Sequence, residues 1–260
     1  MKIYITILTL FLCMACQKKD LEKKKFKNQK LMFQDSGTKN WQDKWTLDGL
    51  KATVVNTELG MEFKAGKEYG NDSCHAVLWT KKIFKGNFRM NYQYTRTDTV
   101  TRCVNILYLL ATGRGSEDYP KDIFKWKEKR KEPKMRIYFK NMNTYHISYA
   151  AFAAKKFSGN NDYIRMRKYN PNKEGLVNTD IKPDYLKTNL FKPFTKYNIE
   201  VIKKDLIIEM NITDVKRPTN NLKCKWDISH LENLKLGRIG IRHMYTRSAI
   251  YKNIEIWQLD

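Results

Sequence analysis

The feature that most constrains the fold is a long succession of segments in which apolar and polar residues alternate. A strand with one buried face produces this pattern, because its side chains point to opposite faces in turn. Gly, Asn, Asp and Lys stand at the breaks between segments, as expected for turns. The alternating segments are 51–58, 75–80, 87–97, 102–110, 136–149, 163–169, 197–212 and 238–259. Only residues 122–131, DIFKWKEKRK, have helical character. Many strands with one short inserted helix predict an all-β jelly-roll β-sandwich of two antiparallel sheets.

The first residues have the pattern of a bacterial lipoprotein signal. Lys2 precedes an apolar run, 3–15, that ends in small residues before Cys16. The run departs from the usual lipoprotein motif in having Cys13 three residues before Cys16, where Leu is expected. It has the length of a secretory signal rather than of a membrane span. We therefore expect residues 1–15 to be removed and Cys16 to carry a lipid, so that the protein is anchored to a membrane only through that lipid.

A polar, lysine-rich segment follows Cys16. Residues 17–30 read QKKDLEKKKFKNQK, with almost nothing to bury, so residues 16–30 are expected to form a solvated, lipidated tether. A Lys-rich, acid-containing segment directly after the lipidated Cys resembles the surface-export signal of Bacteroidetes lipoproteins. This resemblance implies an outer-membrane lipoprotein exposed at the cell surface, with a periplasm-facing orientation as the alternative. Residues 31–260 are then expected to form one carbohydrate-active domain.

Positive charge is the second strong feature of the chain. The formal net charge is +23, of which residues 1–30 contribute +6, so the remaining residues carry +17. A field of this size favours a polyanionic partner such as acidic polysaccharide, nucleic acid or anionic lipid. Nucleic acid fits poorly with display outside the cell, and no helix-turn-helix, RRM or zinc-finger pattern is present. An acidic oligo- or polysaccharide, sulfated chains included, is the expected partner.

Several motif-based functions are not supported. Cys74, Cys103 and Cys224 contain no CxxC pair among them, so neither a zinc site nor a disulfide framework is indicated. The chain has no GxSxG, HExxH or phosphate-binding glycine loop. It also lacks the ExDxxE run by which jelly-roll glycoside hydrolases place two carboxylates on one strand face. We therefore expect no metal site and no cofactor in the chemistry.

Polar side chains gather on particular strand faces. Arg89, Asn91 and Gln93 share one face of their strand. Tyr163, Arg165, Arg167 and Tyr169 share a face of another, and Arg242 lies opposite the Ile239 and Ile241 face of a third. His146 and Ser148 share a face in the run NTYHISY. Three strands could thus contribute arginines to one sheet surface, and His146 is the best single candidate for chemistry.

Three segments, MNTYHISYAAF, DYIRMRKYNP and GRIGIRHMYTRSAIYKNIEIWQL, resemble the YesU-like family of concanavalin A-like jelly-roll proteins from polysaccharide-utilisation loci. The resemblance covers most of the chain after about Lys39. Some members from marine ulvan-degrading loci look related to oligosaccharide dehydratases that work like polysaccharide lyases. The resemblance implies a carbon–oxygen lyase acting by β-elimination on uronic-acid-containing, ulvan-type oligosaccharides. A structural Ca²⁺ occurs in this superfamily, but no dense Asp or Asn loop identifies its ligands here.

β-Elimination explains the residue types well. The C5 proton of a uronate is weakly acidic unless its carboxylate is neutralised, and a positioned side chain must then take that proton. We assign His146 as base or acid and Tyr245 as its proton partner. The expected substrate-binding residues are Arg165, Arg167 and Arg242, which would hold the uronate, Arg89, Asn91 and Asn105, which would line the groove, and His75. A departing sugar would make the enzyme a polysaccharide lyase, and a departing hydroxyl a dehydratase.

Two functions without catalysis compete with this hypothesis. A surface lipoprotein could capture acidic glycans on its arginines, its six Trp and its fifteen Tyr. An envelope protein tethered by Cys16 would serve a structural role and would have no polar groove. The position of His146 distinguishes the first alternative from the enzyme hypothesis. Catalysis requires His146 to share a site with the arginines and a Tyr hydroxyl, whereas glycan binding does not. Fold alone cannot choose between them, because jelly rolls host binders and enzymes alike.

Overall fold

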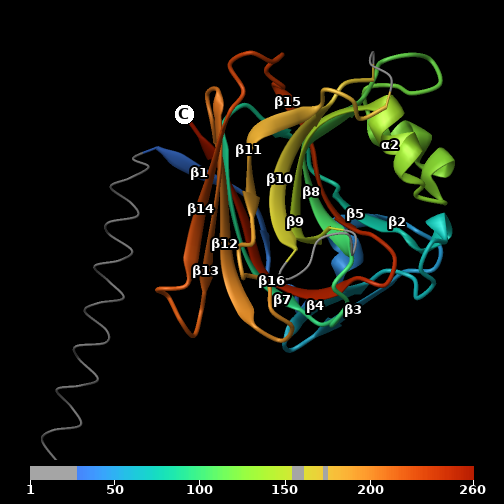
Figure 1. The fold of residues 1–260 in the computed structure, drawn as a ribbon. Helices are drawn as coiled ribbons and strands as arrows, with labels where there is room; N and C mark the ends of the chain where they lie inside the picture. The colour runs from blue at the N-terminus through green and yellow to red at the C-terminus, as the bar shows by residue number, and fades with distance from the viewer. Residues whose placement is uncertain (1–27, 154–160, 172–174) are drawn as a thin grey trace, which may run out of the picture.

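Two antiparallel sheets packed face to face form the core of the protein (Figure 1). The computed structural model describes residues 28–153, 161–171 and 175–260. Within these residues each sheet has eight strands, so the predicted all-β jelly-roll sandwich is confirmed. The expected signal peptide, Cys16 with its expected lipid and residues 17–27 of the expected tether lie outside the described residues. Gln29 and Lys30, which were also expected in the tether, begin the first strand instead. No helix in the described part of the chain combines the length and apolar character that a bilayer span requires.

Sheet A contains the chain's first and last strands. Its strands run in the order β14-β13-β12-β7-β16-β4-β3, with β1 paired to β16. Their bounds are β1 (Gln29–Asp35), β3 (Thr53–Thr57), β4 (Gly60–Lys64), β7 (Phe88–Arg96), β12 (Lys196–Lys204), β13 (Ile207–Asp214), β14 (Asn221–Asp227) and β16 (Ser248–Leu259). The alternating run 197–212 is therefore a hairpin of two strands, which turns at Asp205 with a positive φ of 53°.

Sheet B carries most of the residues singled out in the sequence. Its strands run in the order β11-β10-β9-β8-β15-β5-β2, with β6 paired to β15. Their bounds are β2 (Trp45–Asp48), β5 (Ala76–Thr80), β6 (Phe84–Lys85), β8 (Cys103–Gly113), β9 (Met142–Phe152), β10 (Asp162–Tyr169), β11 (Asp180–Leu186) and β15 (Leu236–His243). The run 238–259 therefore splits between the sheets, as β15 in sheet B and β16 in sheet A.

Short helices flank the sheets. Their bounds are η1 (Trp41–Asp43), η2 (Asp72–Cys74), η3 (Ile123–Arg130) and α2 (Met135–Asn141). The helix expected over 122–131 is present as η3, whose N-cap Asp122 accepts a hydrogen bond from the Phe124 amide at 3.1 Å. The strand expected from residue 136 is wrong for residues 136–141, because α2 occupies them. A short run that alternates can also be helical, and here Met135 and Tyr138, three apart, both pack on sheet B.

Side chains from the facing surfaces of the sheets fill the space between them. Met90 and Tyr94 of β7 meet Ile147 and Tyr149 of β9 in this core. A second apolar cluster lies on the opposite face of sheet B, beneath η3 and α2, and includes Trp79, Tyr108 and Tyr138. Figure 1 shows α2 beside sheet B, on the side away from sheet A. We call this side the outer face of sheet B.

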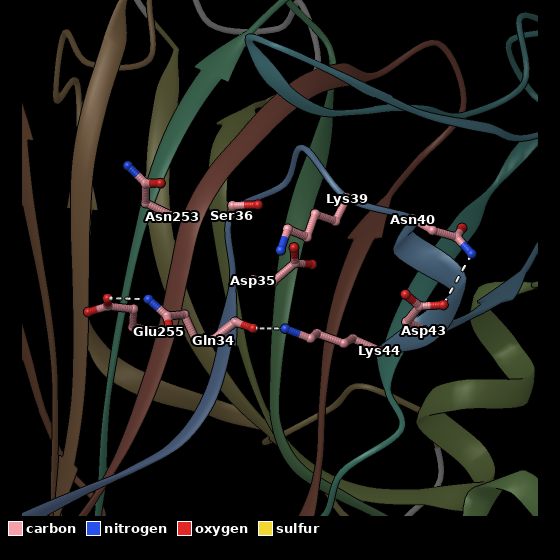
Figure 2. Close-up of a pocket in the computed structure, with 9 residues that line it drawn as sticks. All are labelled: Gln34, Asp35, Ser36, Lys39, Asn40, Asp43, Lys44, Asn253 and Glu255. Carbon is pink, nitrogen blue, oxygen red and sulfur yellow. Dashed lines mark hydrogen bonds between the residues drawn. The ribbon is translucent and has the colours of Figure 1, made fainter.

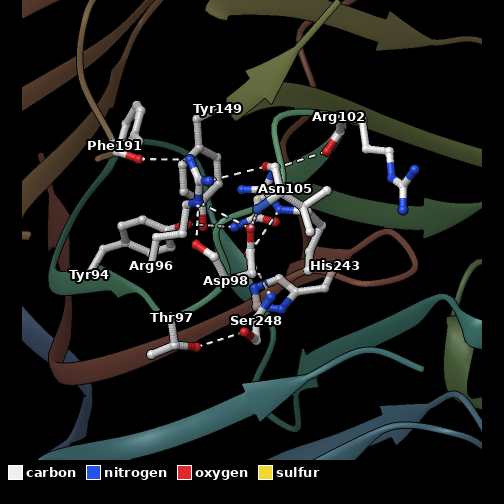
Figure 3. Close-up of polar contacts among 12 residues, drawn as sticks. Tyr94, Arg96, Thr97, Asp98, Arg102, Asn105, Tyr149, Phe191, His243 and Ser248 are labelled. Carbon is white, nitrogen blue, oxygen red and sulfur yellow. Dashed lines mark hydrogen bonds and ion pairs between the residues drawn. The ribbon is translucent and has the colours of Figure 1, made fainter. Parts of the chain in front are cut away.

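Asp98 ties the segment after β7 to β16. Its carboxylate pairs with Arg96 Nε and Arg247 Nε, each at 3.1 Å, and accepts from the Ser248 amide at 2.9 Å. Arg96 Nη1 also donates to the Phe191 carbonyl oxygen at 3.0 Å (Figure 3). Both guanidinium groups are buried, and a buried charge of this kind needs a charged or polar partner. One carboxylate thus links the end of β7 to the start of β16.

Asp48 at the end of β2 fastens the helical cover to sheet B. Its Oδ2 accepts from Trp79 Nε1 at 2.8 Å, Arg130 Nε at 2.6 Å and Tyr138 Oη at 2.9 Å. Trp79 belongs to β5, Arg130 to η3 and Tyr138 to α2, so a single carboxylate joins three elements. The Asp48 and Arg130 side chains are 2% and 0% exposed, which makes this a fully desolvated ion pair.

Asp48→Asn should therefore destabilise the fold strongly, because it leaves the buried Arg130 without a carboxylate. We expect a loss of about 3–5 kcal/mol in the free energy of unfolding, measured by urea denaturation. Asp118→Asn is the matched control. Asp118 pairs with Lys129 of η3, the helix that also contains Arg130, but both side chains of this pair are exposed. The free energy of unfolding should fall by less than about 1 kcal/mol in this variant. Equal effects of the two substitutions would contradict this role for Asp48.

Candidate functional site

The register of sheet B aligns polar residues from four strands in two rows across its outer face. In the first row Arg167 of β10 pairs with His146 of β9, which pairs with Tyr108 of β8. The second row runs Arg165, Ser148, Ile106 and Arg242, from β10 to β15. Because strand side chains alternate, all of these residues face the same side as Trp79. The structure thus brings together His146, Arg165, Arg167 and Arg242, as the strand faces predict.

His146 is the centre of a hydrogen-bonded chain. Its Nδ1 lies 2.7 Å from Tyr169 Oη and its Nε2 lies 2.7 Å from Ser148 Oγ. One ring nitrogen of a neutral imidazole donates and the other accepts. The tautomer of His146 therefore determines the direction in which these hydrogen bonds run. His146 is only 4% exposed and Tyr169 is fully buried. The tyrosine hydroxyl that bonds His146 is therefore Tyr169, a residue to which the sequence assigned a face but no role.

The surroundings keep His146 and Tyr169 uncharged at neutral pH. Burial lowers the pKa of His146 well below its usual value, and the positive charges of Arg167, Arg242 and Arg165 lower it further. Burial also raises the pKa of Tyr169 well above its usual value, with a further contribution from Tyr108. A neutral histidine and a protonated tyrosine thus lie in contact among three guanidinium groups.

Arg165 and Arg167 are held at the outer end of the rows. Arg165 Nε donates to Asp184 Oδ2 at 3.1 Å, and Arg167 Nη2 pairs with Asp180 Oδ1 at 3.0 Å. Their side chains remain 30% and 16% exposed. The Arg165 guanidinium also lies over the ring of Tyr163, 5.0 Å from its centroid. These contacts fix the orientation of both guanidinium planes and leave part of each guanidinium group open to solvent.

A pocket lies next to the residues that hold Arg167, although Arg167 itself does not line it. Asp180, the ion-pair partner of Arg167, lines this pocket of about 390 Å³ between β10, β11 and residues 230–232. Thr179, which accepts from Arg167 Nη1 at 3.1 Å, lines the same pocket. A ligand in this pocket would therefore approach the side chains that hold Arg167.

Arg242 is fully buried at the other end of the second row. Its Nη2 donates to His75 Nδ1 at 2.7 Å and to the Pro133 carbonyl oxygen at 2.6 Å. Burial and the Arg242 charge lower the pKa of His75 to about 3, which leaves its ring nitrogen free to accept. Among the described residues, Arg242 Nε and Nη1 have no hydrogen-bond partner. Arg242 thus adds positive charge beneath the outer face rather than at its surface.

Tyr245 lies beside His75 and is not bonded to His146. Its ring stacks on His75 with 4.5 Å between centroids, and the 58% exposed Tyr69 meets its edge at 5.1 Å. Burial raises the pKa of the Tyr245 hydroxyl. The hydroxyl group in contact with His146 comes from Tyr169 instead, so Tyr245 forms part of an aromatic border to the site.

Three of the expected groove residues lie elsewhere. Arg89 and Asn91 belong to β7 of sheet A and line a depression on that sheet's outer face. Asn105 points between the sheets, where it is fully buried and its Nδ2 donates to Tyr94 Oη at 2.7 Å (Figure 3). Its neighbour Ile106 faces outward, so Asn105 must face the core. The single groove expected from all seven binding residues is therefore not formed.

A polar pocket of about 340 Å³ opens at the edge of sheet A, and none of the expected site residues lines it (Figure 2). Lys44 Nζ donates to the Gln34 carbonyl oxygen, and Asn40 donates to Asp43 at 3.1 Å. Its polar groups thus largely satisfy one another. Over the described ranges, no group of three or more His, Cys, Asp or Glu is placed to hold a metal ion.

Comparison with known proteins identifies the fold. No protein-family model matches the chain, and no curated protein matches it. A protein of unknown function with a galectin-like fold from Bacillus subtilis is similar with a TM-score of 0.65 and 15% identity, over 87% of this chain and 94% of that one. The VIP36 exoplasmic/lumenal domain gives 0.57 and 11%, over 89% and 91%. The Lotus tetragonolobus seed lectin gives 0.56 and 8%, over 88% and 98%. The chain therefore has a galectin-like, jelly-roll β-sandwich fold.

The buried histidines predict how stability depends on pH. Three of the four histidines are buried, and burial lowers the pKa of His243 to about 3, as it does for His75. Below about pH 6.5 the unfolded chain binds protons that the folded protein excludes, so stability falls as pH falls. Each such histidine contributes a slope of up to about 1.4 kcal/mol per pH unit.

His243→Gln should therefore reduce the slope of unfolding free energy between pH 6.5 and 5 by about one third, whatever its effect on stability itself. His230→Gln is the control, because His230 is exposed, and its slope should equal that of the unchanged protein. Urea denaturation at several pH values gives both slopes. An unchanged slope in His243→Gln would show that the folded protein takes up protons at His243.

Proposed function

We propose that this protein binds acidic glycans on the outer face of sheet B. The observation that carries the proposal is the state of Arg165, which uses Nε for Asp184 and has no hydrogen bond from either terminal nitrogen among the described residues. A guanidinium fork with two open donors matches a carboxylate or sulfate in a planar, two-point contact. Tyr163 beneath the guanidinium restricts its motion and so reduces the entropy lost on binding.

The fold and the charge support the same proposal. The VIP36 domain is described in a Ca²⁺/Man3GlcNAc-bound form, and the Lotus protein is a seed lectin. Sandwiches of this kind therefore present sugar-binding surfaces in other proteins, although fold alone does not assign function. The net charge of +23 would attract a polyanion and raise its association rate at low salt. Ulvan-type chains, which combine uronate and sulfate, fit this chemistry and the YesU-like resemblance.

The location of the binding follows from the N-terminal pattern. A lipid on Cys16 and a lysine-rich tether would hold the domain at the outer membrane, facing outward. We propose that the protein captures acidic glycans at the cell surface from this position.

Arg165→Gln/Arg167→Gln should weaken the binding of ulvan or oligogalacturonate at least tenfold, as measured by isothermal titration calorimetry. The matched control is Lys196→Gln/Lys225→Gln, which removes the same charge from exposed positions of sheet A. It should change affinity less than threefold. Equal losses in the two double variants would indicate attraction by net charge alone and would contradict a site on sheet B.

One contact favours catalysis as a second candidate function, namely the 2.7 Å pairing of Tyr169 with His146 among the arginines. In β-elimination a base takes the C5 proton of the uronate, the C4–O bond breaks, a C4–C5 double bond forms, and the departing oxygen receives a proton. The neutral imidazole would accept and the Tyr169 hydroxyl would donate. Arginines at the uronate carboxylate would stabilise the charge that develops.

Elimination should be visible as ultraviolet absorbance and as loss of one water or of a sugar by mass spectrometry. Tyr169→Phe should lower turnover at least a hundredfold, because it removes the hydroxyl bonded to His146. Tyr245→Phe, the same change in a residue stacked on His75, should retain turnover within threefold. The absence of any product from ulvan, alginate, pectin and heparin oligosaccharides would reject catalysis and leave glycan binding intact.

A further inference from the structure

The centre of the outer face of sheet A carries an array of side chains that the proposed function does not use. The strand pairing aligns Gln93, Asn198 and Thr213 in one row across β7, β12 and β13. It aligns Asn91, Glu200 and Asn211 in the next row. These six residues, which we call the amide array, line a depression of about 410 Å³. Each is at least partly open to solvent.

The composition of the amide array is unusual for strand centres. Asparagine is depleted in strands, because its side chain and backbone preferences favour turns. Three adjacent strands nevertheless each carry one here, with Asn91 and Asn211 in one row and Asn198 in the other. Lys and Arg make up 50 of the 260 residues, yet the lining of the depression includes just one of them, Arg89, which pairs with Glu200. Lys223 and Lys225 of β14, the next strand, show that lysine is used on this sheet. Solubility alone therefore does not explain the choice of amides.

The electrostatics of the array point to an uncharged ligand. Glu200 pairs with Arg89 at 2.8 Å, and its other oxygen accepts from Asn211 Nδ2 at 2.8 Å. The flanking lysines are also occupied, since Lys223 pairs with Glu209 and Lys252 donates to the Glu58 carbonyl oxygen. Gln93 Nε2 also donates to Asn198 Oδ1 at 3.3 Å. A ligand at the array would therefore meet paired charges and amides whose remaining donors and acceptors face solvent.

We propose that the amide array is a second glycan-binding site, selective for neutral saccharides. Sugar hydroxyls donate and accept hydrogen bonds, as amide side chains do, and adjacent hydroxyls match amides held in register on neighbouring strands. Trp257 of β16 pairs with Arg89 in register and adds an aromatic flank to this face. The site is in the opposite sheet from Arg165 and Arg167, so it does not depend on the proposed acidic-glycan site.

Calorimetry on the full protein with neutral hexasaccharides of glucose, mannose, xylose and galactose tests this site. At least one should bind saturably. Asn198→Val/Asn211→Val should lower its affinity at least tenfold while leaving the unfolding temperature unchanged or raised, because valine favours strands. Arg165→Gln/Arg167→Gln should bind it as the unchanged protein does. The proposal is overturned if none of the four binds at millimolar concentration, or if the valine variant binds normally.

A structural role for the amides would instead make the valine variant less stable. In that event the Thr213→Arg variant tests whether a ligand binds in the depression, because the arginine side chain fills the depression while every amide is kept. Loss of hexasaccharide binding in Thr213→Arg at an unchanged unfolding temperature supports the site, and unchanged binding overturns it. Because the acidic-glycan variants leave sheet A intact, failure of either site would leave the evidence for the other unaffected.

Discussion

The antiparallel register of β10, β9, β8 and β15 is the constraint on which the candidate site depends. It places Arg167, His146 and Tyr108 side by side on three consecutive strands, so that these strands present one surface. The same register sets Gly240 beside Trp79, and a Cβ at Gly240 would lie 2.4 Å from that ring. The missing side chain lets Trp79 stack on Tyr108, with 5.4 Å between ring centroids. Packing and site geometry thus follow from one pairing pattern.

Burial then gives the aligned residues their chemical character. Helices η3 and α2, which Asp48 fastens to sheet B, cover part of its outer face and exclude water there. Arg242 and Tyr169 are fully buried in this covered part. Under these conditions positive charge is costly on His146, which stays neutral, whereas Arg165 at the open end remains partly exposed and uses only its Nε for Asp184. The result is an uncharged, hydrogen-bonded His–Tyr pair next to a partly exposed guanidinium group. The partly exposed guanidinium group is the feature on which the proposed recognition of an anionic sugar depends.

Strand alternation was enough to predict the fold class and the grouping of several candidate residues on one strand face. It grouped His146 with Ser148 and Arg165 with Arg167, because side-chain parity within one strand needs no tertiary information. It did not show which strands share a sheet, so Arg89 was expected beside Arg165 and lies in the other sheet instead. Nor did it show which face of each strand is buried, so Asn105 was expected in a groove. Sheet assignment depends on long-range pairing, which the local pattern does not encode.

The central claim is that acidic glycans contact the outer face of sheet B. The most direct measurement is NMR mapping of chemical-shift changes while a short oligogalacturonate is titrated into isotopically labelled protein. Our account predicts that the largest changes fall on β9 and β10, around His146, Arg165 and Arg167, with the buried core unaffected. Changes confined to sheet A, or spread evenly over surface lysines, would contradict it.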